Sequence, residues 1–163
     1  VVDVPGSVLK SVCAGKLGPL LIKPNLIEFQ QLVGKEHSSC EAVVSVARAF
    51  TDRIPMICVS SVERGAILVS SNSAWFGRTP EVKVRSSVGA GDSMVGAMCA
   101  ILNRWQIKTR HDERFLPLLE ERGDELLRWG LAAACATLTV HGTQLGNAKE
   151  MEVFAPLIQI NKL

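Results

Sequence analysis

The chain has 163 residues, of which 47% are hydrophobic and 21% charged, a composition that fits one globular domain with a full core. A net charge of +2 with dispersed basic residues excludes a basic nucleic-acid-binding face, and the apolar runs are too short to cross a membrane. The five cysteines are scattered without a Cys-x-x-Cys pair, which is typical of buried thiols in a reducing compartment and indicates a cytoplasmic protein without a structural zinc site.

Short apolar strands alternate with amphipathic helical segments through the first half of the chain. The hydrophobic pattern predicts strands at residues 1–4, 20–22, 55–60, 66–69, 74–76 and 81–84. It predicts helices at residues 7–14, 25–33 and 41–52. A polar Ser-Ser-Asn-Ser segment separates the strands at 66–69 and 74–76, so we expect these two strands to pair as a hairpin.

From residue 92 onward the pattern is helical almost to the end of the chain. Predicted there are a strongly charged solvated insertion or surface helix at residues 106–122, a helix of small residues at 126–139, and a last helix at 153–160. Alternating strands and helices favour a parallel sheet covered on both faces. We therefore expect an α/β fold, a three-layer α/β/α sandwich with a mainly parallel sheet.

A glycine-rich segment, Gly89-Ala90-Gly91-Asp92, begins the helical half. Small residues at the start of a helix leave backbone N–H groups uncovered at its positive end, which favours an anion. Asp92 on the same turn is suited to accept a proton beside that anion, a combination that suggests phosphoryl transfer to a hydroxyl. The alternative is an ordinary strand-to-helix turn in which Asp92 or Ser93 caps the helix.

A second segment, Lys23-Pro24-Asn25-x-x-Glu28, follows the apolar run at residues 20–22. Pro24 keeps Lys23 out of helical geometry, so the strand passes into a loop there. Asn25 can then begin a helix with Glu28 in the capping-box position, and this local role is one interpretation of both residues. In the other interpretation, Lys23 supplies a point charge to a phosphate and Glu28 holds hydrated magnesium.

These two segments, together with Val59-Ser60 and Gly65-Ala66 between them, closely resemble the C-terminal half of the PfkB-type carbohydrate kinases, a ribokinase-like family. The resemblance covers nearly the whole chain. Residues 88–98, 129–134 and 142–143 are most similar to the minor bacterial 6-phosphofructokinase branch. The resemblance implies that residues 1–163 form the nucleotide-binding and catalytic C-terminal part of a ribokinase-like domain, without the N-terminal half and lid of the family.

The resemblance implies a catalytic role for the glycine-rich segment. Asp92 would be the base that accepts the proton of the sugar hydroxyl. The backbone N–H groups of Gly89, Ala90 and Gly91 would stabilise charge on the γ-phosphoryl group of ATP as it moves. These roles fit a loose transition state, which needs positioning and charge neutralisation more than activation of the nucleophile.

The resemblance also implies which residues bind the cofactors ATP and Mg²⁺. Lys23 and Asn25 would face the nucleotide phosphates, while Glu28 together with Asn25 would order magnesium-bound water.

Further residues of the nucleotide pocket come from three other segments. Ser60 and Gly65 would belong to the adenine-nucleotide loop, and Gly142 with Thr143 would form a later wall of the same pocket. A potassium site is common in the family, and here Ser86 and Val88 offer oxygens to such an ion.

The chain departs from the family pattern in three respects. Val62 stands where the nucleotide loop usually has glycine, and a β-branched residue there is expected to restrict the backbone and to crowd the ribose or phosphates. Residues 104–122 match least well. Without the N-terminal half the chain would lack the acceptor pocket and would expose a strand edge, most of all at residues 1–4, which favours a homodimer.

The function expected from the resemblance is ATP-dependent phosphorylation of a sugar phosphate, with fructose 6-phosphate converted to fructose 1,6-bisphosphate. The partners are then a nucleotide and a sugar phosphate. One alternative keeps the fold and changes the acceptor to fructose 1-phosphate, tagatose 6-phosphate, ribose or a nucleoside. The other is a truncated, inactive nucleotide-binding module, an interpretation that Val62 and the missing N-terminal region favour.

Overall fold

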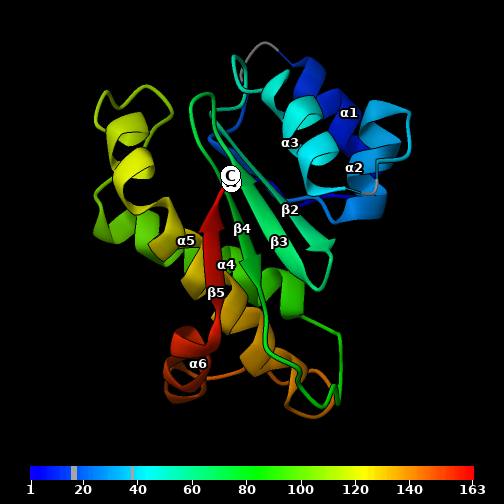
Figure 1. Ribbon diagram of the computed structural model, residues 1–163, viewed down its shortest axis with the longest axis vertical. Coiled ribbons are helices and arrows are strands. Elements are labelled where there is room, and N and C mark those ends of the chain that lie inside the picture. Colours follow the sequence, from blue (N-terminus) through cyan, green and yellow to red (C-terminus); the bar gives the residue numbers. More distant parts are fainter. Residues whose placement is uncertain (16–17, 38) are drawn as a thin grey trace.

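The computed structural model describes residues 1–15, 18–37 and 39–163 (Figure 1). Its elements, in chain order, are α1 (Gly6–Ala14), β1 (Leu21–Ile22), α2 (Leu26–Val33), α3 (Cys40–Arg48), β2 (Met56–Val62), β3 (Gly65–Val69), β4 (Ala74–Arg78), α4 (Ala90–Arg104), α5 (Phe115–Leu138), α6 (Ala148–Phe154), a 3₁₀ turn (Ala155–Leu157) and β5 (Gln159–Lys162). Among the helices so described, none is both long and apolar enough to span a bilayer.

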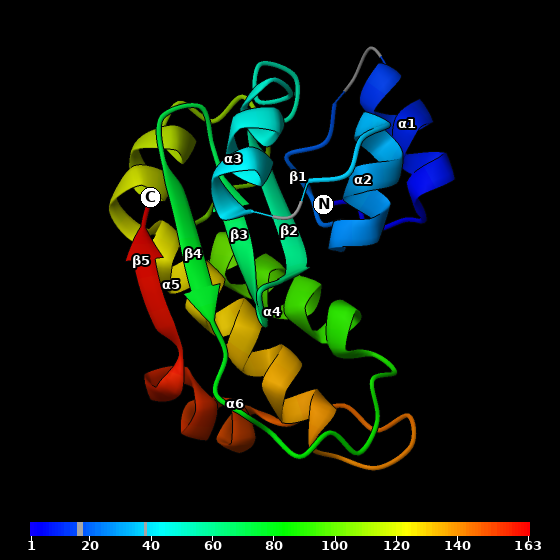
Figure 2. The ribbon, with the colours of Figure 1, turned by 45° about the vertical axis from the view of Figure 1, so that its right-hand side comes forward.

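The five strands form one sheet in the order β1-β2-β3-β4-β5 (Figure 2). Only β1 and β2 pair in parallel, whereas the other three pairings are antiparallel. The prediction of a mainly parallel sheet is therefore wrong for the strands described. For the pairings of β2 with β3 and of β3 with β4 the cause is connection length, because a parallel pairing needs a crossover of a dozen or more residues, and only Glu63 and Arg64 join β2 to β3.

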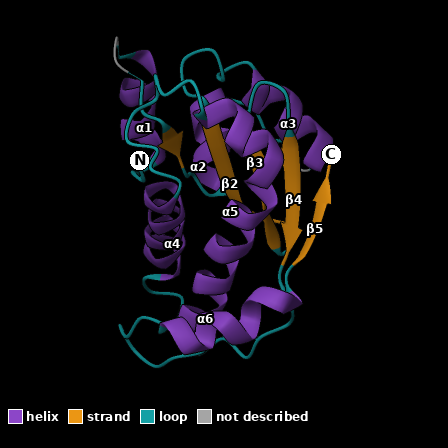
Figure 3. Cartoon of the chain, turned by 90° about the vertical axis from the view of Figure 1, so that its left-hand side faces the viewer, coloured by secondary structure: helices purple, strands orange, loops and turns teal. Residues whose placement is uncertain are grey.

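Helices cover both faces of the sheet, so the expected three-layer sandwich is confirmed (Figures 2 and 3). Side chains alternate along β2: Met56 and Cys58 pack in a cluster with α4 and α5, while Ile57 and Val59 pack in a cluster with α1, α2 and α3. A strand that is buried on both faces has no polar side to alternate with, and this explains the continuous apolar run.

Two predictions of secondary structure near the glycine-rich segment and the C-terminus are wrong. Residues 81–84 form no strand and instead lead into a loop in which the N–H of Arg85 donates to the Leu138 carbonyl at 2.8 Å. The predicted last helix stops early: α6 ends at Phe154, a 3₁₀ turn containing Pro156 follows, and β5 then pairs antiparallel with β4. Residues 159–162 are a strand because they pair with β4, and the hydrophobic periodicity within residues 153–160 does not predict that pairing.

The charged segment at residues 106–122 is only partly the solvated insertion that was expected. Its second part is the beginning of α5, where Phe115 and Leu119 are buried in the core. The 24-residue helix continues through a break in helical geometry at Arg122. The predicted strand at residues 1–4 is reduced to a single parallel bridge between Val2 and Ile22, and a homodimer formed through this edge stays a prediction.

Candidate active site

The first turn of α4 presents backbone donors that no side chain covers. Gly89 is the N-cap residue, in left-handed geometry with φ of 81°, and no side chain caps the helix. The N–H of Ser93 donates to the Gly89 carbonyl at 2.8 Å, and that of Ala90 makes only a long contact of 3.5 Å with Ser87. Among the hydrogen bonds of the described residues, none is donated by the N–H groups of Gly91 or Asp92. These donors are therefore available to an anion.

Glycine at position 89 is favoured by its left-handed backbone conformation. A Cβ at this position would also lie 2.7 Å from Cδ2 of Leu145, the end of an exposed side chain. Leu145 does not line the cavity next to the turn, whereas Ala90 and Gly91 do. The mouth of the helix is thus open at those two residues.

Lys23 brings a buried positive charge to this turn. The chain leaves β1 at Lys23, whose side chain is 5% exposed, and its Nζ lies 3.1 Å from Oδ2 of Asp3. A Cβ built on Gly91 would be 3.3 Å from the same Nζ, so the ammonium group lies directly beside the donor turn. Sequence reasoning missed Asp3, although a single carboxylate within the apolar run Val1-Val2-Asp3-Val4 is a recognisable signal.

A cavity of about 510 Å³ brings these segments together. Six of the residues singled out from the sequence line it: Lys23, Asn25, Ser60, Gly65, Ala90 and Gly91. Its other lining residues are Ser61, Arg64, Thr79, Ser87, Met94, Leu131, Ala134 and Leu138. The lining contains two cationic side chains and no carboxylate, and the partners of these cations, Asp3 for Lys23 and Glu81 for Arg64, lie outside it. With the uncovered N–H groups of α4, this lining favours an anionic ligand.

Asn25 and Glu28 form the reciprocal capping box that the sequence predicts. The Asn25 N–H donates to Oε2 of Glu28 at 2.9 Å, and the Glu28 N–H donates to Oδ1 of Asn25 at 2.9 Å. A carboxylate and an amide oxygen each have further lone pairs, so the capping role leaves both residues able to accept from metal-bound water. In the described part of the chain, no three His, Cys, Asp or Glu side chains cluster to hold a metal directly.

The β2–β3 turn forms one rim of the cavity through Ser60, Ser61 and Arg64. A bulge between Ser60 and Val62 gives Ser61 a φ of 63° and directs the Val62 side chain into the core next to α1–α3. Val62 therefore does not crowd the cavity, contrary to the expectation from its departure from glycine. Gly65 has a steric reason of its own, because a Cβ there would lie 1.9 Å from the Gly77 carbonyl oxygen.

Asp92 follows Gly91 on the same turn and is exposed, outside the cavity lining. No hydrogen bond or ion pair with another described residue occupies its carboxylate. Gly89 and Glu28 also lie outside the cavity lining. A carboxylate that is exposed and unpaired at this position is free to accept a proton from a group that approaches the turn.

The remaining predicted residues lie on two neighbouring loops rather than on the cavity wall. Gly142 and Thr143 are exposed and do not line the cavity; their loop contacts the other loop where His141 meets Arg85. Val88 is exposed and Ser86 accepts a hydrogen bond from the Val88 N–H at 3.2 Å. The apolar wall comes instead from Leu131, Ala134 and Leu138 of α5, which the sequence pattern indicated only as a packing surface.

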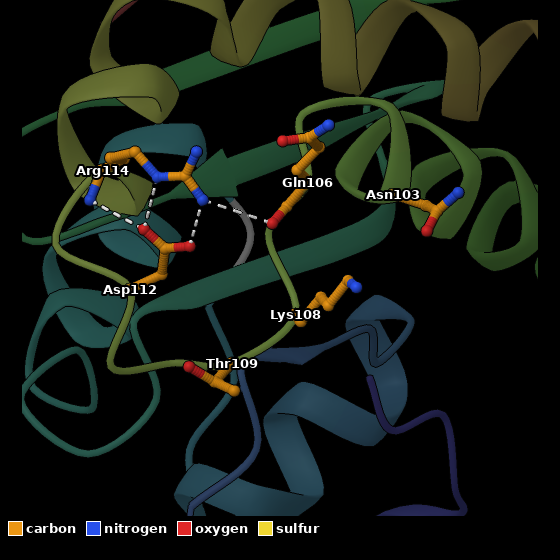
Figure 4. Close-up of a pocket in the computed structure, with 6 residues that line it drawn as sticks. All are labelled: Asn103, Gln106, Lys108, Thr109, Asp112 and Arg114. Carbon is orange, nitrogen blue, oxygen red and sulfur yellow. Dashed lines mark hydrogen bonds and ion pairs between the residues drawn. The ribbon is translucent and has the colours of Figure 1, made fainter.

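A larger cavity of about 650 Å³ lies elsewhere, between the end of α4 and the start of α5 (Figure 4). None of the residues predicted for the site lines it. Its Arg114 guanidinium is held by both carboxylate oxygens of Asp112, at 2.7 and 3.0 Å, and by the Gln106 carbonyl oxygen at 3.4 Å, as Figure 4 shows. The lining of this cavity includes the Asp112 carboxylate, and none of the uncovered N–H groups at the start of α4 lies there.

Comparisons with known proteins agree with this geometry. The family model described as pfkB family carbohydrate kinase matches residues 7–150. The 1-phosphofructokinase of Escherichia coli strain K12 is 29% identical over 147 residues, which are 90% of this chain and 42% of that protein. The ATP-dependent 6-phosphofructokinase isozyme 2 of the same strain is 33% identical over 149 residues, covering 89% of this chain and 42% of that protein.

A solved structure is similar in fold as well as in sequence. The crystal structure of phosphofructokinase-2 from Escherichia coli in complex with substrates and products superposes with a TM-score of 0.76 at 30% identity, over 95% of this chain and 46% of that one. The chain thus spans less than half the length of each of these proteins. Because the family model matches most of its residues, the chain belongs to the pfkB family of carbohydrate kinases.

Proposed function

We propose that this chain forms the nucleotide-binding and phosphoryl-transfer part of an ATP-dependent sugar kinase. One observation carries the proposal: three separate segments converge on a single cavity, and they bring to it a buried ammonium group, uncapped helix donors and no carboxylate. A polyphosphate is the ligand that such a cavity complements. The apolar side chains of α5 that line the cavity would then contact the base of the nucleotide.

In this proposal the α4 turn stabilises the charge that moves during transfer. The N–H groups of Gly89, Ala90 and Gly91 would donate to the terminal phosphoryl group, and Lys23 would add a point charge beside them. Because the transition state is loose, positioned donors of this kind supply most of the protein's contribution. These donors belong to a helix that is fixed by packing, so they need little reorganisation.

Asp92 would act as the base on the acceptor side of the turn. The proton would pass from the sugar hydroxyl to a carboxylate oxygen of Asp92 while the hydroxyl oxygen bonds to phosphorus and the bond to ADP breaks. A carboxylate of ordinary basicity is sufficient, since the hydroxyl loses its proton late in a loose transition state. The exposed position of Asp92 leaves it accessible to an acceptor.

The capping-box residues would also serve the metal. The free lone pairs of Glu28 and Asn25 suit magnesium-bound water, and bound magnesium would neutralise charge on the nucleotide phosphates. Phosphofructokinase-2 from Escherichia coli has been solved in complex with potassium, which supports a similar ion here. Ser86 and Val88 would offer oxygens to it.

We propose that the acceptor is a fructose phosphate, with fructose 6-phosphate as the preferred one. The two relatives of 29% and 33% identity are named for different acceptors, fructose 1-phosphate and fructose 6-phosphate. Sugar-dependent release of ADP is therefore to be measured with both fructose phosphates, and also with tagatose 6-phosphate, ribose and a nucleoside.

The first test is calorimetric titration of Mg-ATP into the chain as it stands. We expect binding in the parent chain, weaker binding in Lys23→Met, and parent-like binding in the control Asp52→Asn, which changes an exposed carboxylate in the turn after α3. If ATP does not bind to the folded parent chain, the proposal is wrong.

The second test measures sugar-dependent release of ADP. It uses the chain alone and a fusion that adds the N-terminal region of the 33% identical 6-phosphofructokinase isozyme 2. We expect turnover in the fusion and a fall in kcat of about 10²–10⁴-fold in Asp92→Asn, with the affinity for ATP unchanged. Nucleotide binding without turnover in either form would favour the inactive module.

A further inference from the structure

The N-terminal segment is held beside β1 in a fixed register. The Val2 N–H donates to the Leu21 carbonyl at 2.9 Å, and the Lys23 N–H donates to the Val2 carbonyl at 3.1 Å. Val2 and Val4 pack against the cluster on the α1–α3 side of the sheet. Since successive side chains of an extended segment point to opposite faces, Asp3 points to the α4 side, level with Lys23.

The resulting ion pair lies next to the donor turn of α4. Asp3 Oδ2 is 3.1 Å from Lys23 Nζ, and the two side chains are 25% and 5% exposed. A Cβ on Gly91 would lie 3.3 Å from the ammonium nitrogen and 3.7 Å from the carboxylate oxygen. Lys23 lines the cavity and Asp3 does not, so the lysine rather than the carboxylate is placed to meet a ligand.

Two properties of Lys23 make a fixed partner important: its ammonium group is buried, and its side chain is flexible. Leaving such a charge unpaired in a protein interior is costly, so Asp3 both neutralises Lys23 and fixes where its Nζ lies. The four-carbon stem has many rotamers, and a lysine that is held by one carboxylate loses less freedom when a phosphate binds. Among the described residues, Asp3 is the only ion-pair partner of Lys23.

Resting on the proposed function, we propose that Asp3 is a positioning residue: it holds the Lys23 ammonium beside Gly91, where Lys23 recognises the terminal phosphate of ATP. The turn next to Lys23 is the one assigned to the phosphoryl group that moves. Asp3 therefore determines how strongly the site prefers a nucleoside triphosphate over the diphosphate. A purely stabilising role would leave that preference unchanged, and an effect of the Asp3 charge alone would raise it when the carboxylate is removed, because ATP carries more negative charge than ADP.

The test is a double-mutant cycle in which binding is measured for two nucleotides. Calorimetric titrations of Mg-ATP and Mg-ADP are made on the parent chain, Asp3→Asn, Asp3→Glu, Lys23→Met and the double variant, with Asp52→Asn as the control. We expect the ATP-over-ADP affinity ratio to fall about tenfold in Asp3→Asn, as for loss of one charge-assisted hydrogen bond. Asp3→Glu is expected to restore part of the ratio, and Asp3→Asn is expected to add nothing in the Lys23→Met background.

Each other outcome is decisive. An unchanged ratio in Asp3→Asn, or equal weakening of ATP and ADP accompanied by a lower Tm, would overturn the inference while the proposed function stands. Tighter ATP binding in Asp3→Asn would overturn it too, because Asp3 would then repel the phosphate rather than position Lys23. If the parent chain binds neither nucleotide, the proposed function fails and this inference fails with it.

Discussion

Substituting Gly91 with alanine separates the stability of α4 from its ability to bind an anion. Gly91 is in the first turn of α4 with an ordinary helical conformation, so a methyl group there fits the helix itself. The methyl carbon would nevertheless lie 3.3 Å from Lys23 Nζ, which is closer than an ordinary contact. The ammonium group must then move by a few tenths of an ångström, and its partner oxygen on Asp3, 3.7 Å from the same carbon, limits that movement.

The two effects have opposite signs. Replacing glycine by alanine inside a helix stabilises it by about 0.8–1 kcal/mol, and the close contact with Lys23 removes part of that gain. A charge-assisted hydrogen bond contributes roughly 1.5–3 kcal/mol, and the smaller value corresponds to about a tenfold change in affinity. We therefore expect Gly91→Ala to be at least as stable as the parent chain and to bind ATP about tenfold more weakly.

Gly96→Ala is the matched control, because Gly96 is exposed in the same helix and a Cβ there would meet nothing within 4 Å. Its free energy of unfolding in urea is expected to rise by about 0.8–1 kcal/mol, with calorimetric ATP affinity unchanged. Equal ATP affinities in Gly91→Ala, Gly96→Ala and the parent would refute the reasoning, since the donor turn and Lys23 would then not form the phosphate site.

Two further predictions concern buried groups around the site. Thr137 is fully buried, and its hydroxyl oxygen accepts from the Gly146 N–H at 3.0 Å and lies 2.7 Å from Ser93 Oγ. Thr137→Val leaves these two partner groups unpaired, so it should lower the free energy of unfolding in urea by about 1–3 kcal/mol. Thr137→Ser keeps the hydroxyl, and an equal loss in both variants would assign the effect to the methyl group instead. Burial raises the pKa of the Cys58 thiol to about 12, so the folded chain keeps this proton above the pKa of about 8.5 of an unfolded thiol. The contribution of this buried thiol to the free energy of unfolding is fully present below that pH and declines as pH rises toward 12, by up to about 1.4 kcal/mol per pH unit. In a pH series of urea unfolding, the free energy of unfolding should therefore fall less steeply with pH in Cys58→Ala than in the parent chain. Identical slopes would contradict this account.

The features that the sequence predicted well are those with local causes. Asn25 and Glu28, three residues apart, predict the start of a helix with a capping box, and the structure forms both hydrogen bonds of that box. The hairpin of β3 and β4 follows from two apolar runs around a polar turn, and its paired residues include Val69 and Ala74. In both cases the partners are so close along the chain that few alternatives compete.

The features that the sequence missed depend on partners far away in the chain. β5 is a strand because Lys162 pairs with Trp75, and nothing within residues 153–160 records that pairing. Residues 81–84 have the composition of a strand and form none, and the loop that follows them pairs through Arg85 with Leu138. Of the three antiparallel pairings, only that of β4 with β5 joins segments distant in the chain; the other two are hairpins with short connections.

By itself, the sequence determined the chemical types that the site needs: a lysine before a proline, a turn of small residues, and a carboxylate one residue beyond it. Only the tertiary structure decided which of them share a cavity, that Val62 points away from it, and that Asp3 stands beside Lys23. The physical reason is that the residues of each motif are neighbours in the sequence, whereas the register of Val2 against Ile22 comes from contacts between segments distant in sequence. The bulge at Ser61 lies within the β2–β3 hairpin, but hydrophobic alternation alone does not show where a strand gains an extra residue.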